Sequence, residues 1–202
     1  MGNLASTYWN QGGWKEAEGL DVQVMETTKR VLGQEHPGTL TSMGSLASTY
    51  WNQGRWKEAE GLQVQVMETR KKKEAEGLQV QVMETRKRVL GQEHPDTLTS
   101  MGSLASTYRN QGRWKEAEGL QVQVMETRKR VLGQEHPGTL TSMGSLASTY
   151  WNQGRWDEAI ALIENCFELQ KQILGPKHPD TESSLQALYE WKSEADEHEY
   201  SD

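Results

Sequence analysis

The chain has 202 residues, a formal net charge of −7 and a hydrophobic fraction of 34%. Its shortage of Lys and Arg argues against a general nucleic-acid binder, because no surplus of cations is available to neutralise phosphates. Cys166 is the single cysteine, which excludes an internal disulfide and is typical of a reducing, cytoplasmic location. No apolar run approaches the ~20 residues that cross a membrane, so no membrane contact is expected.

A string of residues recurs through the chain at a period of 42. Leu40–Trp56 reads LTSMGSLASTYWNQGRW, residues 98–114 differ from it only by Arg109 in place of Trp51, and residues 140–156 are identical to it. A fixed period in the range of about 20 to 50 residues indicates a solenoid, in which each repeat completes the apolar face of its neighbour.

One repeat predicts two helices. His36-Pro37 opens the first, since Pro suits the first helical turn, and Asn52-Gln53-Gly54 ends it. The apolar residues of the first helix fall at three- and four-residue spacing: Leu40, Met43, Leu46, Ala47 and Tyr50. The second helix carries a similar stripe: Trp56, Ala59, Leu62, Val66 and Met67. The fold class is therefore expected to be all-α.

The start of the chain falls inside a repeat. Met1 corresponds to Met43, so the first helix lacks the HPGTLTS opening that its later copies have. This indicates either that an upstream segment, such as an ATPase or effector domain, has been lost or that the gene model is incomplete.

These features resemble the tetratricopeptide repeat. The residues that carry the resemblance are the large–small pair Leu46-Ala47, the aromatic Tyr50, the turn residue Gly54, the second aromatic Trp56 and the small Ala59. The period and the Leu-Gly-x-x-His-Pro-x-Thr linkers at 132–139 and 174–181 resemble the kinesin-light-chain subtype. Near-identical tandem copies also resemble the C-terminal repeat arrays of fungal NOD-like receptor proteins. The resemblance implies a helical-hairpin solenoid, wound as a right-handed superhelix, with the first helices lining its concave face.

The regular order is broken once. Lys57–Lys72 reads KEAEGLQVQVMETRKK, and Lys73–Arg88 repeats it with one change, without a first helix between the copies. No Pro and no Gly-rich turn separates them, so a single long helix from about Trp56 to Leu90 is expected. A shift of 16 residues rotates the apolar stripe by about 160° around that helix.

Three arrangements of this long helix are possible. It bridges two repeat blocks, at 1–72 and 73–193, or it breaks near Arg70–Lys73 into a hairpin. In the third arrangement its second stripe recruits another chain and makes a homodimer. The residues of that self-association hypothesis are Leu78, Val82 and Met83. The bridging helix is the favoured interpretation.

The far end departs from the repeat. From Asp157 the sequence becomes more apolar and is expected to form a capping repeat, with a last helix from about Pro179 to Trp191. Residues 194–202 are acidic and are expected to be a disordered tail.

No motif for chemistry appears in the sequence. The four His-Pro histidines recur along the solenoid and would not converge on a metal, and no phosphate-binding loop or nucleophile motif is present. Cys166 lies in an apolar stretch that predicts a packed, inert thiol. We expect no enzyme activity, no cofactor and no metal.

The candidate site is therefore the concave face implied by the resemblance. Trp and Arg are common at binding hot spots, an amide suits an extended peptide backbone, and an Arg favours a carboxylate on the ligand. The candidate residues are Trp9, Asn10, Ser48, Trp51, Asn52, Ser106, Arg109, Asn110, Ser148, Trp151 and Asn152. For the Asn residues, turn formation is an equal alternative, and each Trp can instead pack on the adjacent repeat.

The sequence thus predicts a protein-interaction scaffold that binds a protein or peptide along its groove. Two roles within this class are a motor-cargo adaptor, which the lack of a heptad segment disfavours, and a receptor sensor. The alternative from another class is a decayed or self-associating fragment without an external ligand.

Overall fold

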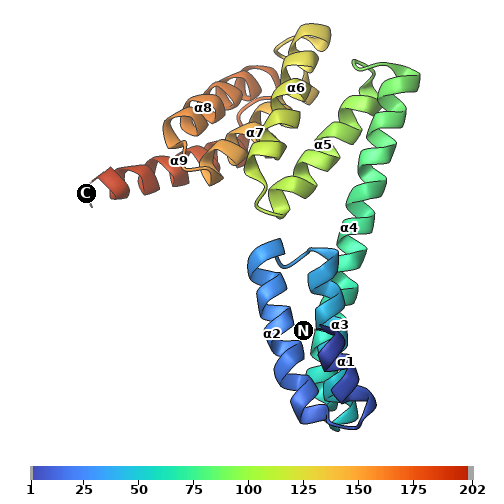
Figure 1. The fold of residues 1–202 in the computed structure, drawn as a ribbon. Coiled ribbons are helices and arrows are strands. Elements are labelled where there is room, and N and C mark those ends of the chain that lie inside the picture. The colour runs from blue at the N-terminus through green and yellow to red at the C-terminus, as the bar shows by residue number, and fades with distance from the viewer. Residues whose placement is uncertain (1, 200–202) are drawn as a thin grey trace. The chain divides into compact units, whose positions relative to one another are not determined.

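The computed structural model describes residues 2–199, which form nine α-helices and no strand (Figure 1). The helices are α1 (Gly2–Asn10), α2 (Trp14–Leu32), α3 (Pro37–Asn52), α4 (Trp56–Leu90), α5 (Pro95–Asn110), α6 (Trp114–Leu132), α7 (Pro137–Asn152), α8 (Trp156–Ile173) and α9 (Pro179–Glu199). First and second helices alternate along the chain. The expected all-α helical-hairpin solenoid is confirmed.

The His-Pro histidines begin the first helices. His36 Nδ1 accepts a hydrogen bond from the backbone N–H of Gly38 at 3.0 Å, and His136 does the same with Gly138. This contact satisfies a backbone donor that the first helical turn leaves unpaired. The preceding helix is followed by Gly33, whose φ of 91° is open to glycine without steric cost. The histidines therefore have a structural role, which sequence reasoning did not assign to them.

Residue contacts divide the chain into two compact units, which meet within α4 at Ala75 and Glu76. Unit 1, which ends at Ala75, has a core cluster of Leu40, Met43 and Val66. Unit 2, which starts at Glu76, has two core clusters, one around Met83, Leu98, Met101, Leu104 and Val124, and one around Leu140, Met143, Ala147, Ile163, Cys166 and Leu188. Each cluster combines side chains of first and second helices.

Cys166 lies in the second cluster of unit 2. Its Sγ donates to the carbonyl oxygen of Leu140 at 3.3 Å, and burial raises the pKa of the thiol to about 11. A protonated, enclosed thiol is a poor nucleophile. The structure thus agrees with the expected packed cysteine.

Helix α4 is a single helix of 35 residues, so the expected long helix is confirmed and a break near Arg70–Lys73 is wrong. The first copy packs on α3 through Val66, which is buried beside Leu40. The second copy packs on α5 through Met83, which is 8% exposed. Met83 therefore does not belong to an exposed stripe, because its neighbours in α5 cover it.

Two residues of the expected second-helix stripe are also exposed. Trp56 and Met67 have 53% and 55% of their surface in solvent, although the stripe pattern placed them in the core. No further first helix follows the first copy in α4 to cover Met67. The Trp56 ring instead meets the edge of Trp51 at a centroid distance of 4.5 Å.

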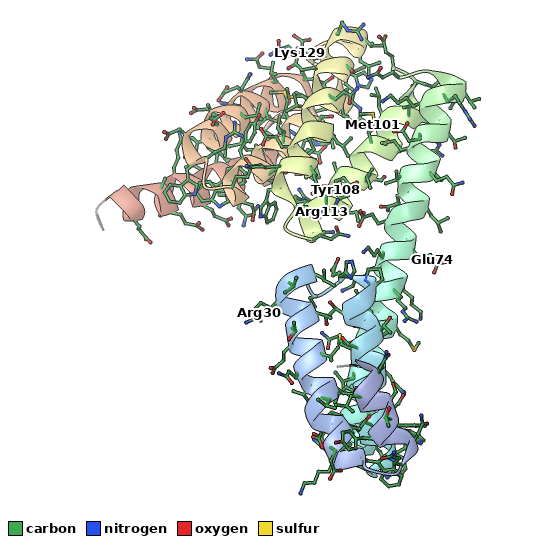
Figure 2. All side chains as sticks on the ribbon, in the orientation of Figure 1. Arg30, Glu74, Met101, Tyr108, Arg113 and Lys129 are labelled. Atoms are coloured by element: carbon green, nitrogen blue, oxygen red, sulfur yellow. The ribbon has the colours of Figure 1, made fainter. Side chains whose placement is uncertain are left out.

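An arginine after the turn holds three of the junctions between repeats. Arg113 Nη1 donates to Glu76 Oε1 at 2.7 Å, and its guanidinium carbon lies 4.0 Å from the centroid of the Tyr108 ring (Figure 2). Arg55 and Arg155 repeat both contacts with their own partners. Because one side chain joins a carboxylate of the preceding second helix to the tyrosine of a first helix, it fixes how these helices pack.

The last helix is longer than expected. α9 continues past Trp191 to Glu199, so residues 194–199 are helical instead of disordered, and the rest of the expected tail, residues 200–202, lies outside the described residues. The segment 194–199 contains neither Gly nor Pro, and three of its residues are Glu, which favours helix. Lys192 Nζ also pairs with Glu164 Oε1 of α8 at 2.9 Å.

Candidate functional site

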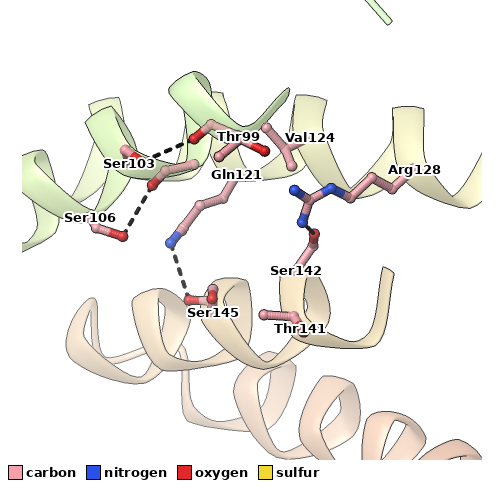
Figure 3. A pocket seen from close by; sticks show the side chains of 10 residues that line it. Thr99, Ser103, Ser106, Gln121, Val124, Arg128, Thr141, Ser142 and Ser145 are labelled. Carbon is pink, nitrogen blue, oxygen red and sulfur yellow. Dashed lines mark hydrogen bonds between the residues drawn. The ribbon is translucent and has the colours of Figure 1, made fainter. Parts of the chain in front are cut away.

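In unit 2 the first helices α5 and α7 face a cavity of about 240 Å³, with side chains of α6 on its remaining wall (Figure 3). Hydroxyl groups dominate its lining: Thr99, Ser103, Ser106, Thr141, Ser142 and Ser145. The cavity also contains side chains of Gln121, Val124 and Arg128.

Several of these hydroxyls donate to their own helix. Ser103 Oγ donates to the carbonyl of Thr99 at 3.0 Å, Ser106 Oγ to that of Gly102 at 3.0 Å, and Thr141 Oγ1 to that of Pro137 at 2.9 Å. A hydroxyl has one proton and two lone pairs, so each oxygen can still accept a hydrogen bond. The wall therefore favours a ligand that carries N–H donors.

Gln121 adds a stronger acceptor. Its Nε2 donates to the carbonyl of Ser145 at 3.2 Å, which can only accept, so this contact fixes the orientation of the amide. Its Oε1 is buried and has no partner among the described residues. At the equivalent positions of α2 and α4, Asp21 and Gln79 accept hydrogen bonds from Thr49 and Thr107. An unpaired buried acceptor costs free energy that a ligand donor would recover.

Arg128 places a cation in the same cavity. Its Nη1 donates to Gly138 O and to Ser142 Oγ, both at 3.0 Å, and no carboxylate of the described chain pairs with it. Burial lowers the pKa of Arg128, because removal from water disfavours the charged form. An anionic group of a ligand would compensate this charge.

A second cavity of unit 2, of about 260 Å³, lies along α7 and α9. It brings together two candidates from the sequence, Arg109 and Ser148, with Trp191. Gln170 also lines it, and its Oε1 is buried without a partner among the described residues. Trp151 is not among the residues that line this cavity. Its ring stacks on that of Trp191 at a centroid distance of 5.0 Å.

Unit 1 has the corresponding cavities between its own first helices. Trp9, Asn10 and Ser48 line one of about 350 Å³ together with Asp21. Trp9 and Ser48 also line a second, together with Trp51, Asn52 and Gln63. Trp51 is 53% exposed and is available to a ligand.

The Asn residues take part in ending the first helices. Asn52 Nδ2 donates to the carbonyl of Ser48 at 2.8 Å, and Asn152 Nδ2 to that of Ser148 at 2.6 Å. These contacts use the amide donor within the helix and leave the amide oxygen of each residue able to accept a hydrogen bond. Asn110 is exposed and lines neither cavity of unit 2.

The sequence predicted candidate residues on the first helices but not the residues of the second helices that line the same cavities. Gln121, Arg128 and Gln170 all lie on α6 or α8 and reach the cavities from there. The sequence did contain a signal for these residues: each is a polar residue that lies close to the apolar stripe of its helix.

Among the described residues, no group of three or more His, Cys, Asp or Glu side chains could hold a metal ion. Across the same residues, no helix is long and apolar enough to cross a membrane. The arrangement is a polar, hydrogen-bonding surface on a stack of helical hairpins, the geometry of a repeat protein.

Two models of a repeat-protein family match the chain. Both are named tetratricopeptide repeat; one matches residues 1–72, and the other matches residues 69–96, 97–138 and 139–180. The chain therefore belongs to the tetratricopeptide repeat family. Repeats of this family commonly mediate protein–protein interaction and are generally not catalytic.

Several solved structures are similar to the chain. One is a variant of a Podosopora anserina kinesin light chain with nearly identical TPR-like repeats: the identity is 30%, 98% of this chain and 88% of that chain are covered, and the TM-score is 0.50. Another is BtubC (BKLC) from P. vanneervenii, which shares the fold at 18% identity, 95% and 70% coverage and a TM-score of 0.51. No curated protein is significantly similar to the chain.

Proposed function

We propose that this chain is a scaffold that binds an extended segment of a partner protein along the face lined by its first helices. The observation that carries the proposal is the hydroxyl-lined cavity between α5 and α7, next to which the buried Oε1 of Gln121 has no partner among the described residues. An extended peptide has free N–H groups at regular intervals, which match this acceptor and the hydroxyl oxygens beside it.

The cations define the ligand further. Arg128 and Arg109 line the two cavities of unit 2, and Arg128 has no ion pair among the described residues. A carboxylate-bearing side chain on the peptide would pair with such a guanidinium. We therefore propose an acidic peptide segment as the ligand, bound by a cytoplasmic protein, a location that the free Cys166 favours.

A displayed library of random peptides, selected on the purified chain, tests this function. We expect acidic sequences to be enriched. For an enriched peptide we expect Arg128→Gln to weaken the affinity by about tenfold or more, and Gln121→Met by about threefold to tenfold. Lys129→Gln is the matched control, because Lys129 is an exposed neighbour on α6 (Figure 2).

Circular dichroism of each variant checks that the helices remain folded, and Arg128→Lys should restore part of the affinity. Failure to enrich any peptide, or an affinity that Arg128→Gln leaves unchanged, contradicts the proposal.

Similarity to the Podosopora kinesin light chain favours a narrower second candidate, a motor-cargo adaptor. In that role the enriched peptides would match segments of transported proteins, and co-purification with a motor would be expected. Absence of a motor from the purified complex argues against the adaptor and leaves peptide binding intact.

A further inference from the structure

Helix α2 of unit 1 differs from its copies in α4 and α6 at two polar positions. Position 21 holds Asp, whereas the copies hold a neutral amide at the equivalent positions: Gln63, Gln79 and Gln121. Seven residues further along the helix, Thr28 stands where the copies hold Arg. Both exchanges shift the charge toward negative, so the ligand preference of unit 1 is expected to differ from that of unit 2.

Asp21 is a buried carboxylate at a cavity. It has 8% of its surface exposed and lines the cavity of about 350 Å³ between α1 and α3, which we name the Asp21 cavity. Its Oδ2 accepts a hydrogen bond from Thr49 Oγ1 at 2.7 Å, but a hydroxyl does not compensate the charge. No Lys, Arg or His of the described chain forms an ion pair with Asp21. A cation that enters the cavity would therefore offset the cost of burying this carboxylate.

The other walls of the Asp21 cavity suit an ammonium group on an aliphatic chain. Ser45 Oγ donates to the carbonyl oxygen of Thr41 at 3.3 Å. Ser48 Oγ donates in the same way to Gly44 at 3.0 Å, so both hydroxyl oxygens can still accept a hydrogen bond. Trp9 lines the same cavity and is 40% exposed. An indole ring attracts a cation to its face and covers methylene groups, and an ammonium brings three N–H donors for the oxygens.

We propose that the Asp21 cavity binds the ammonium group of a lysine side chain of the partner protein, with Asp21 as the counter-charge and Trp9 against the aliphatic chain. The inference extends the proposed scaffold function with a second ligand group of opposite charge. The site lies wholly in unit 1 and contains none of the residues that line the cavities of unit 2. A partner with a basic and an acidic segment would engage one unit with each.

NMR titration of the full chain tests the site, with the indole N–H signal of Trp9 as the readout. Loss of that signal in Trp9→Phe assigns it. The probe is the peptide Ala-Ala-Lys-Ala-Ala, acetylated and amidated at its ends so that the lysine carries its only charge. We expect a saturable shift of the Trp9 signal. The same peptide with Gln in place of Lys should bind about tenfold more weakly or worse, because it has no charge to pair with Asp21.

The matched variants change the charge of α2 inside and outside the cavity. Asp21→Gln should weaken the lysine probe by about tenfold or more, and Asp21→Glu should keep part of the affinity. The first variant is expected to fold, because Gln79 at the equivalent position accepts a hydrogen bond from Thr107 as Asp21 does from Thr49. Circular dichroism checks this. Glu26→Gln is the control, since it removes a negative charge from an exposed position of the same helix.

Three results would overturn the proposal: a Trp9 signal that the lysine probe does not shift, a glutamine probe that binds equally well, or an affinity that Asp21→Gln leaves unchanged. The acidic peptides selected on the chain are titrated against the same variants and against Arg128→Gln. Retained binding of the lysine probe with no acidic ligand would contradict only the function proposed for unit 2, so the two sites fail separately.

Discussion

The two copies within α4 differ at one of 16 positions, yet they bury different side chains. The first copy buries Ala59 and Val66, and the second buries Met83. Their local sequence gives both the same helix, so local propensity cannot explain the difference. What differs is the neighbour: α3 packs on one copy and α5 on the other. The repeated segment therefore has two packing flanks, and the adjoining helices decide which flank becomes core.

The largest expected difference in stability is between substitutions of Met83 and Met67, which occupy the same position in the two copies. Met83→Ala should lower the free energy of unfolding by about 2 to 4 kcal/mol, because it leaves a cavity beside Leu98 and Met101. Met67→Ala, the same substitution in the other copy, should change it by less than about 0.5 kcal/mol. Urea unfolding measures both, and equal effects would show that the two copies have the same environment.

Val66 and Val82 occupy the same position in the two copies, and here the first copy should lose more stability on substitution. Val66→Ala should cost about 2 kcal/mol, because Val66 is buried with Leu40 and Met43. Val82→Ala should cost much less in a monomer, since Val82 is exposed. The comparison is made by thermal unfolding at low concentration. A larger loss for Val82→Ala than for Val66→Ala would mean that the packing flanks are assigned wrongly.

A glutamate pair gives the smallest effect and adds a dependence on pH. Burial raises the pKa of Glu76, but hydrogen bonds from Arg113 and Gln111 outweigh it, so the net pKa is below the usual value. Among the described residues its counterpart Glu60 has no ion pair. Glu76→Gln should cost on the order of 1 kcal/mol at neutral pH, and Glu60→Gln almost nothing.

The sign of the pH dependence follows from that lowered pKa. The stabilisation by ionised Glu76 is present above the pKa of the unfolded chain and is lost as the pH falls through the lower, folded value. The stabilities of the wild type and of Glu76→Gln should therefore converge in acid, as unfolding curves between neutral pH and about pH 3 would measure. A constant difference across this range is incompatible with the Arg113 contact.

The repeat period and helical spacing predict much of the fold. Leu40 and Met43 are buried as expected, and the continuity of α4 follows from the lack of Pro or a turn between its copies. The burial of Met83 and the exposure of Met67 could not be predicted, because two nearly identical segments give no local signal of their neighbours. The extension of α9 to Glu199 was missed because acidic composition was weighed above helix propensity.

The candidate site was predictable in outline only. Period and resemblance point to the first helices, and the cavities of unit 2 lie along them, one of them with Arg109 and Ser148 in its wall. The unpaired Gln121 could not be foreseen, because Gln79 at the equivalent position is satisfied by Thr107. Whether a buried amide has a partner depends on side-chain geometry that the spacing of residues does not contain.

The central claim is that the near-identical copies in α4 have different environments, and methionine methyl NMR tests it most directly. Spectra of the wild type are recorded with and without a soluble paramagnetic agent. The account predicts strong broadening of the Met67 methyl signal and protection of the Met83 signal. Equal broadening of the two signals would contradict it.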